Sequence, residues 1–249
     1  MLKLLLNVPI IKRLIPHAYK WYLKIFKITK VNFIFESLSI DLDPRHLIDR
    51  NLYFTGSYEE AEYNHLCKYI EKHKADYFFD IGACWGLYSI RIGNKYKDIN
   101  VQSFEPIKKN IDRLKKSIIK NNLTNINYHN IALGNYNGEL KLNVDSNHSP
   151  NYFYKDQGNI FQSEICKISR LDTILQTKES IIAIKIDVEG YELAVLNGAK
   201  KLLAENKCII LIEIDHETKK DVFDFFSSIN FLVLIDTNLS GHNYLFSNI

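Results

Sequence analysis

The sequence has 249 residues, of which 46% are hydrophobic and 24% charged, which argues against a disordered chain, a collagen-like chain and a membrane bundle. The formal net charge is +3, but residues 1–30 carry seven Lys and Arg and no acid, so the other 219 residues hold 25 basic and 29 acidic groups, a net charge of −4. A mildly acidic body argues against general nucleic-acid binding, because phosphate binding needs a clustered positive field.

Residues 1–30, which we call the basic head, open the chain. Their first apolar run is short and is broken by Asn7 and Pro9, whereas a membrane-spanning helix needs roughly 18–20 apolar residues. No small-residue cleavage site follows, which argues against a secretory signal. Two interpretations stay open and can coexist. The head is a helical arm packed on the domain, or an interfacial helix with Trp21 and Phe26 on its apolar side and lysines outside.

The rest of the chain alternates between strand and helix patterns. We expect an extended stretch over 31–49 with a turn at Asp43-Pro44, and a hairpin excursion over 139–145 and 151–168. Strands are predicted at 77–81, 100–104, 126–128, 181–186, 208–214, 231–235 and 242–246. Helices are predicted at 58–74, 86–96, 107–121, 191–203 and 218–228.

This alternation predicts an α/β fold with a doubly wound, mostly parallel seven-stranded sheet. We assign residues 51–249 to that domain and residues 1–50 to the basic head and an extended segment. In such sheets, ligands bind at the carboxyl edge of the strands, near the point where the strand order reverses. The residues directly after each strand are therefore the candidates for a site.

A glycine turn, DIGACWG at 80–86, follows the first strand of this alternating part. Gly82 lets the backbone turn, and Gly86 lets a ligand or another strand approach closely. The spacing matches neither the dinucleotide fingerprint nor a phosphate loop. The leading acid, Asp80, suits a cationic ligand group, although a plain β-turn is the alternative interpretation.

Acidic residues also follow the later strands. Glu105 comes after the next strand, where a carboxylate can accept hydrogen bonds from two ribose hydroxyls. Asp187 and Glu189 follow the buried strand 181–186, and Asp215 with His216 follows the strand after that. Helix capping or a surface charge is the alternative for Glu105, and helix capping is the alternative for Asp187 and Glu189.

Five segments resemble the FkbM family of S-adenosylmethionine-dependent methyltransferases, over roughly residues 56–214. They are FFDIGACWGLYS (78–89), SFEP (103–106), NIALGN (130–135), RLDTIL (170–175) and IKIDVEGYELAVLNGAKKLL (184–203). The last segment is the most specific. Family members usually have Asn where this chain has Cys84. The resemblance implies a Rossmann-like methyltransferase fold and O-methylation of a hydroxyl on a sugar, a glycan or a small natural product.

The resemblance also assigns roles at the first two strand ends. Asp80 and the turn residues Gly82, Ala83 and Gly86 would face the methionine part of S-adenosylmethionine, whose ammonium explains the acid. Glu105 would bind the ribose.

Further roles fall on the later segments. Asn130 and Ala132 would border the adenine, and Asp187 would lie near the transferred methyl and the acceptor. Asp172 belongs to the matched RLD run, with helix capping as its alternative role.

The chemistry of a hydroxyl acceptor adds two hypotheses, because the hydroxyl proton must be removed. His216 is a candidate base, since histidine titrates near neutrality, and a solvated loop side chain is the alternative. Asp187 and Asp215, with His216 or Glu189, are candidates for holding a divalent cation that would activate the hydroxyl.

Two other functions remain as alternatives: a non-catalytic cofactor-binding or membrane-tethering module, and a nucleic-acid methyltransferase. The second would bring an Asn/Asp-Pro-Pro-aromatic run after the strand that here ends in Asp187, and this chain has Asp-Val-Glu-Gly instead. The four cysteines are widely spaced, without a C-x-x-C pair, which favours a reducing compartment. We therefore expect a cytoplasmic protein with peripheral membrane contact through the basic head, no nucleic-acid partner and a small-molecule or glycan acceptor.

Overall fold

A computed structural model of the chain describes residue 25 and residues 29–144, 162–235 and 242–249. The chain divides into two compact units, residues 1–60 with 146–149 and residues 61–145 with 150–249. Most of the basic head and the middle of the predicted excursion lie outside the described residues, so the interpretations of those segments stay predictions.

The described part of the first unit is a β-hairpin followed by a helix. β1 (Val31–Phe35) pairs antiparallel with β2 (Leu38–Leu42), and α3 (Leu47–Thr55) follows. The sequence predicted only an extended stretch here, with a turn beyond the second strand, so the hairpin and the helix are corrections. The hairpin turn is made by Glu36 and Ser37, both at positive φ, and neither is the Gly or Pro that marks most turns.

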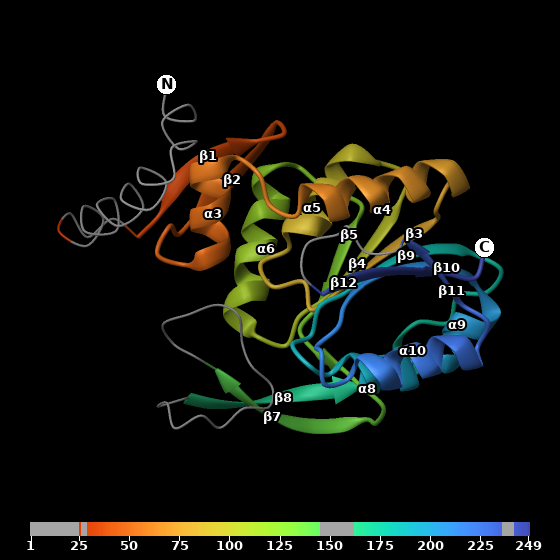
Figure 1. Ribbon diagram of the computed structural model, residues 1–249. Helices are drawn as coiled ribbons and strands as arrows, with labels where there is room; N and C mark the ends of the chain where they lie inside the picture. The colour runs from red at the N-terminus through yellow and green to blue at the C-terminus, as the bar shows by residue number, and fades with distance from the viewer. Residues whose placement is uncertain (1–24, 26–28, 145–161, 236–241) are drawn as a thin grey trace. The chain divides into compact units, whose positions relative to one another are not determined.

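A seven-stranded sheet forms the centre of the second unit, with the strand order β11-β12-β10-β9-β3-β4-β5 (Figure 1). The strands are β3 (Tyr77–Ile81), β4 (Asn100–Phe104), β5 (Ile126–His129), β9 (Ile181–Ile186), β10 (Lys207–Glu213), β11 (Leu232–Ile235) and β12 (Asn243–Ser247). Neighbours from β10 to β5 are parallel, and β12 runs antiparallel to both β10 and β11. The predicted doubly wound, mostly parallel seven-stranded sheet is therefore confirmed. Its strand order reverses between β3 and β9.

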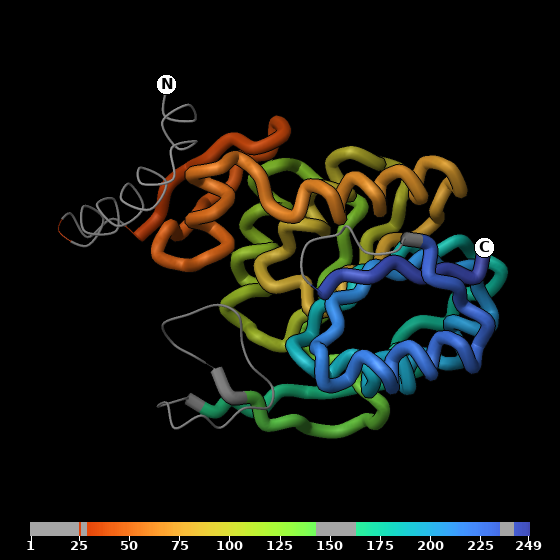
Figure 2. The backbone as a smooth tube through the Cα atoms, in the orientation of Figure 1, coloured from red at the N-terminus to blue at the C-terminus, as the bar shows by residue number. Residues whose placement is uncertain are grey.

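Helices cover both faces of this sheet (Figures 1 and 2). They are α4 (Glu60–His73), α5 (Leu87–Lys95), α6 (Lys108–Lys120), α7 (Leu171–Ile174), α8 (Glu192–Asn197), α9 (Lys200–Glu205) and α10 (Lys219–Ser228). α4 and α5 lie on one side, and α9 and α10 lie on the other.

The predicted single helix over 191–203 is wrong, because α8 and α9 are separate helices divided at Gly198. A Cβ atom on Gly198 would lie 1.9 Å from the carbonyl oxygen of Gly134. The Gly198 carbonyl in turn accepts a hydrogen bond from the Asp172 N–H at 3.0 Å. Contacts with distant segments fix the backbone here, and local helix periodicity cannot reveal them.

A second, three-stranded sheet has the order β6-β8-β7. β7 (Gly138–Val144) pairs antiparallel with β8 (Gln162–Ser169), and the short β6 (Ala132–Leu133) pairs parallel with β8. The predicted hairpin excursion is confirmed where the structure describes it.

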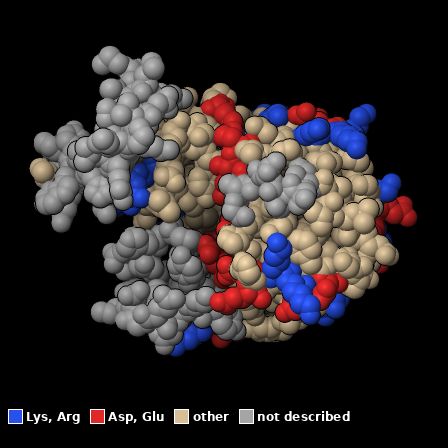
Figure 3. Space-filling view, in the orientation of Figure 1, with Lys and Arg blue, Asp and Glu red and all other residues tan. Residues whose placement is uncertain are grey.

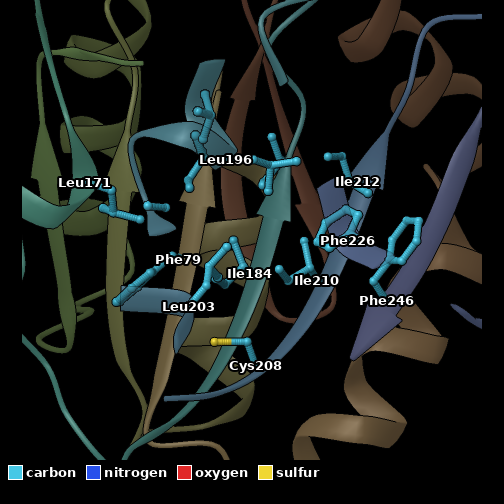
Figure 4. Packing of buried hydrophobic residues seen from close by; sticks show 14 of the residues in the cluster. Phe79, Leu171, Ile184, Leu196, Leu203, Cys208, Ile210, Ile212, Phe226 and Phe246 are labelled. Carbon is cyan, nitrogen blue, oxygen red and sulfur yellow. The ribbon is translucent and has the colours of Figure 1, made fainter. Parts of the chain in front are cut away.

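A tightly packed apolar cluster holds the seven-stranded sheet against α8, α9 and α10 (Figure 4). Ile184 of β9 and Ile210 of β10 are at most 1% exposed, and the rings of Phe226 and Phe246 stack with centroids 4.0 Å apart. Burial of this kind contributes about 25 cal/mol per Å² of apolar surface, so it holds the strand ends in place. Side chains alternate along a strand, which places Lys185 on the face opposite Ile184.

No helix within the described ranges is long and apolar enough to cross a membrane.

Candidate functional site

The glycine turn lies at the carboxyl end of β3, pressed between two other segments. Gly82 and Gly86 have φ values of +79° and +84°, the left-handed region that glycine occupies without strain. A Cβ on Gly82 would lie 1.8 Å from the Asp187 carbonyl oxygen, and one on Gly86 would lie 2.3 Å from Leu114 Cδ1. The sequence predicted that a ligand or another strand approaches Gly86, and the structure places the Leu114 side chain there. Gly82, predicted to let the backbone turn, also lies against the carbonyl of Asp187.

Backbone hydrogen bonds hold the turn against the end of β4. The N–H groups of Gly82 and Ala83 both donate to the carbonyl of Phe104 at 3.0 Å. The next N–H, of Cys84, donates to Glu105 Oε2 at 2.9 Å. The turn and the acid after β4 thus form one hydrogen-bonded unit at the place where the strand order reverses.

Glu105 is 5% exposed and is surrounded by hydrogen-bond donors. Its Oε1 accepts from the N–H of Ile107 at 2.8 Å and from Asn110 Nδ2 at 3.3 Å. Burial raises the pKa of this carboxyl to about 7, although these donors and the Cys84 N–H oppose the shift. Both carboxyl oxygens already accept hydrogen bonds from the protein, and the contact of Glu105 with ribose stays a prediction.

Asp80 lies beneath the turn and is 2% exposed. Its Oδ2 accepts from the N–H and the hydroxyl of Ser89 at 3.0 and 2.5 Å, and the Ser89 hydroxyl lies 2.7 Å from that of Ser103. Burial raises the pKa of Asp80, while the nearby charge of Lys185 lowers it. In this structure the carboxylate anchors the first turn of α5, and its predicted role toward an ammonium group stays a prediction.

The residues after β5 connect neighbouring strand ends. Asn130 Nδ2 donates to the carbonyls of Glu105 and Pro106 at 3.1 and 2.7 Å, which joins the end of β5 to the end of β4. Ala132 is 3% exposed and begins β6. These contacts place Asn130 near Glu105, and the predicted position of Asn130 and Ala132 beside the adenine stays untested.

Asp187 lies at the end of β9, beside the glycine turn. Its N–H donates to the Ile81 carbonyl at 3.0 Å, and its Oδ2 lies 2.7 Å from Lys185 Nζ. The sequence argument assigned no role to Lys185. A signal was present, since a lysine interrupts the apolar run Ile181–Ile186, and lysine is rarely buried without a partner.

Further carboxyl groups gather around Glu189, which has a positive φ of 54°. Burial raises the pKa of Glu189 to about 8, and the negative charges of Asp187, Glu213, Glu192 and Asp215 add to the shift. The negative charges around Glu189 favour a cationic ligand over an anionic one at this edge. Figure 3 shows acidic side chains in red and basic side chains in blue on the face turned toward the viewer.

His216 and Asp215 are both exposed in the loop after β10. Asp215 Oδ2 lies 3.8 Å from the Cβ position of Gly190, so the loop reaches the segment that follows Asp187. Within the described ranges, no group of three or more His, Cys, Asp and Glu side chains could hold a metal ion. The hypothesis of a divalent cation on Asp187 and Asp215 thus gains no support, and the role of His216 as a base stays a prediction.

Asp172 has a structural role. Its Oδ1 accepts from the Leu202 N–H at 2.9 Å, and its Oδ2 accepts from the Lys201 N–H at 3.2 Å. These are free N–H groups of the first turn of α9, so the carboxylate caps that helix from a distant part of the chain.

The strand order, the glycine turn after β3 and the acids after β4 and β9 together define a Rossmann-like methyltransferase. A family model described as the methyltransferase FkbM domain matches residues 80–245, and the chain belongs to this family.

Among solved methyltransferase structures similar to this chain, the FkbM structure shares the fold. The methyltransferase FkbM from Methylobacillus flagellatus KT is 19% identical, with a TM-score of 0.51 over 79% of this chain and 52% of that one. The tRNA (uracil-54, C5)-methyltransferase of Pyrococcus abyssi, solved with S-adenosyl-L-homocysteine, is 9% identical, with a TM-score of 0.48 over 88% and 43% of the two chains. The alignment spans about half the length of the FkbM structure, and its 19% identity shows the fold alone. No curated protein matches the sequence.

Proposed function

We propose that this methyltransferase uses S-adenosylmethionine to methylate a hydroxyl group on a sugar, a glycan or a small natural product. The observation that carries the proposal is the hydrogen-bonded unit of the glycine turn and Glu105 within the matched family domain. It lies where the strand order of the sheet reverses, which is the usual ligand position in open α/β sheets.

The side chains at this edge fit the cofactor chemically. S-adenosylmethionine presents an ammonium, a sulfonium and two ribose hydroxyls, which call for hydrogen-bond acceptors and negative charge. The edge offers Glu105 beside the turn as a hydrogen-bond acceptor and the negative charge of Asp187 beyond β9. In this proposal Glu105 holds the ribose, the turn faces the methionine part, and Asp187 lies near the transferred methyl.

The cofactor supplies an electrophilic methyl group, and the protein supplies position and a proton acceptor. Charge is dispersed during methyl transfer, so correct placement of the acceptor provides much of the acceleration. Asp187 and His216 are the residues we propose to orient the acceptor hydroxyl and take its proton. The acidic edge disfavours phosphate-rich acceptors, which supports a neutral acceptor over a nucleic acid.

We also propose that the protein works in the cytoplasm and contacts anionic membranes through the basic head. The supporting observation is the sequence itself, with seven basic and no acidic residues among residues 1–30. This contact would bring the domain close to lipid-linked acceptors.

Two measurements test the proposed function. Calorimetry with S-adenosylmethionine and S-adenosylhomocysteine asks first whether the chain binds either ligand, and absence of binding would overturn both enzyme proposals. Incubation with methyl-labelled S-adenosylmethionine and fractionated cell extract then asks where the label goes. We expect label in a glycan or a soluble small molecule and none with D187N. Label in RNA would favour the nucleic-acid alternative, and binding without transfer would favour a non-catalytic module.

A further inference from the structure

Lys185 is a nearly buried cation between two carboxylates of the site. Its side chain is 7% exposed, and its Nζ lies 2.7 Å from Asp187 Oδ2. The same Nζ lies 4.9 Å from the centre of the Tyr88 ring, an attractive cation–π position. In the parallel ladder between β3 and β9, Lys185 is the register partner of Asp80. The lysine therefore connects the buried floor of the glycine turn with the acid at the edge.

The backbone of Asp187 is already fixed by other contacts. Its N–H donates to the Ile81 carbonyl, and its own carbonyl packs against Gly82. What remains free is rotation of the side chain, which is 24% exposed. The ion pair with Lys185 occupies Oδ2, and no described residue donates a hydrogen bond to Oδ1. The pair thus selects one orientation of the carboxylate and leaves one oxygen available to a ligand.

We propose that Lys185 is a positioning residue that holds the Asp187 carboxylate in the orientation used toward the cofactor sulfonium and the acceptor. This inference rests on the proposed function, because it assumes that Asp187 lies beside the transferred methyl. Lys185 acts through Asp187 and does not itself touch the reacting atoms.

Two physical roles of a buried lysine predict opposite results. If Lys185 positions Asp187, its removal frees the carboxylate and weakens the binding of the cationic cofactor. If Lys185 acts only as a nearby positive charge, its removal makes the site more negative and strengthens the binding of a cation. S-adenosylhomocysteine lacks the sulfonium charge, so the ratio of the two dissociation constants isolates the effect at the sulfur.

The test is a double-mutant cycle read by calorimetry on the full chain, with K185M, D187N and the double variant. We expect K185M to weaken S-adenosylmethionine binding about tenfold and S-adenosylhomocysteine binding about twofold or less, a difference of the size expected for one charge-assisted contact. K185M should cause no further loss in the D187N background. K185R should restore affinity to within about threefold, because it keeps the charge.

Controls distinguish a failure of this inference from a folding defect and from a failure of the proposed function. K207M makes the same change at the exposed start of β10 and should bind both ligands like the wild type. K185Q replaces K185M in the cycle if circular dichroism shows that K185M does not fold. If the wild type binds neither ligand, the proposed function is wrong and the inference falls with it. The inference alone is wrong if the wild type binds S-adenosylmethionine and K185M binds it equally well or more tightly. It is also wrong if K185M lowers the affinity of the D187N variant as much as it lowers the affinity of the wild type.

Discussion

The carbonyl oxygen of Asp187 lies where a side chain on residue 82 would begin, since an ideal Cβ on Gly82 would be only 1.8 Å from it. This contact joins the turn after β3 to the end of β9, two segments far apart in the chain. The two most distinctive motifs of the sequence therefore meet through their backbones. The relative position of the glycine turn and the Asp187 side chain depends on residue 82 having no Cβ.

We expect G82A to be severely destabilising. The substitution combines a left-handed φ of +79° with a collision against backbone, which cannot move aside as a side chain can. A loss of about 3 kcal/mol or more in the free energy of unfolding, or failure to fold, is the expected size for such a change. Urea unfolding measures it. G138A is the matched control, because its Cβ would meet nothing closer than 3.5 Å, and equal losses in the two variants would contradict the argument.

At Cys84 we expect a substitution that increases the free energy of unfolding. Its φ is +50°, a conformation that asparagine tolerates better than other residues with side chains. We expect C84N to raise the free energy of unfolding by about 0.5 kcal/mol and C84V, which is β-branched, to lower it by about 1 kcal/mol or more. Thermal unfolding of the two variants beside the wild type checks the order. A C84N variant no more stable than C84V would show that backbone conformation does not set the preference.

The cap on α9 predicts a measurable loss of stability for D172A. The carboxylate satisfies two N–H groups at the start of that helix, so its removal should cost about 1–2 kcal/mol of stability. D112A is the comparison, because Asp112 pairs with Lys108 on the exposed face of α6. Exposed pairs contribute about 0–1 kcal/mol, so D112A should change stability by less than D172A in chemical denaturation.

Glu189 predicts how stability depends on pH. Its pKa is about 8 in the folded protein, against an ordinary value of 4.5, so the folded state holds the proton over a range where the unfolded chain has lost it. The free energy of unfolding should therefore fall as pH rises between these two values. E189Q should flatten this slope in urea unfolding at several pH values, and E139Q, at an exposed position of β7, should leave it unchanged. Glu105 contributes a slope of the same sign up to about pH 7, so some dependence should remain in E189Q. A slope unaffected by E189Q would contradict this assignment.

We expect cofactor binding and membrane binding to depend on different parts of the chain, with membrane binding depending on the basic head. A variant lacking residues 1–30 should bind the cofactor about as well as the full chain, because the matched family domain begins at residue 80. The same variant should lose most of its partitioning to vesicles that contain anionic lipid, since the head carries seven basic residues and no acid. Sedimentation with anionic and with neutral vesicles measures this. Unchanged partitioning would leave the packed-arm interpretation of the head.

The sequence determined the architecture of the methyltransferase domain, because strands and helices are encoded by local patterns. The strands at 77–81, 100–104 and 181–186 begin and end at the predicted residues. The first and the last of them are short, largely apolar runs. Parallel strands then present their carboxyl ends at one edge, which is why Gly82, Glu105 and Asp187 could be selected as candidates without coordinates. The hairpin at 31–42 was not predicted, because its turn has no glycine or proline.

Only the tertiary structure decided which of these groups touch. It showed that Asp80 anchors Ser89 beneath the turn, that Gly198 divides α8 from α9, and that Lys185 pairs with Asp187. The contact of Gly198 with Gly134 joins segments far apart in the chain. The other two pairs lie nine and two residues apart, and the direction of the chain after each strand decides whether their side chains meet. Sequence periodicity tells which face of an element a side chain occupies, but packing decides which residue it meets on that face. Burial increases the energetic effect of a charge or of a missing Cβ at such a contact.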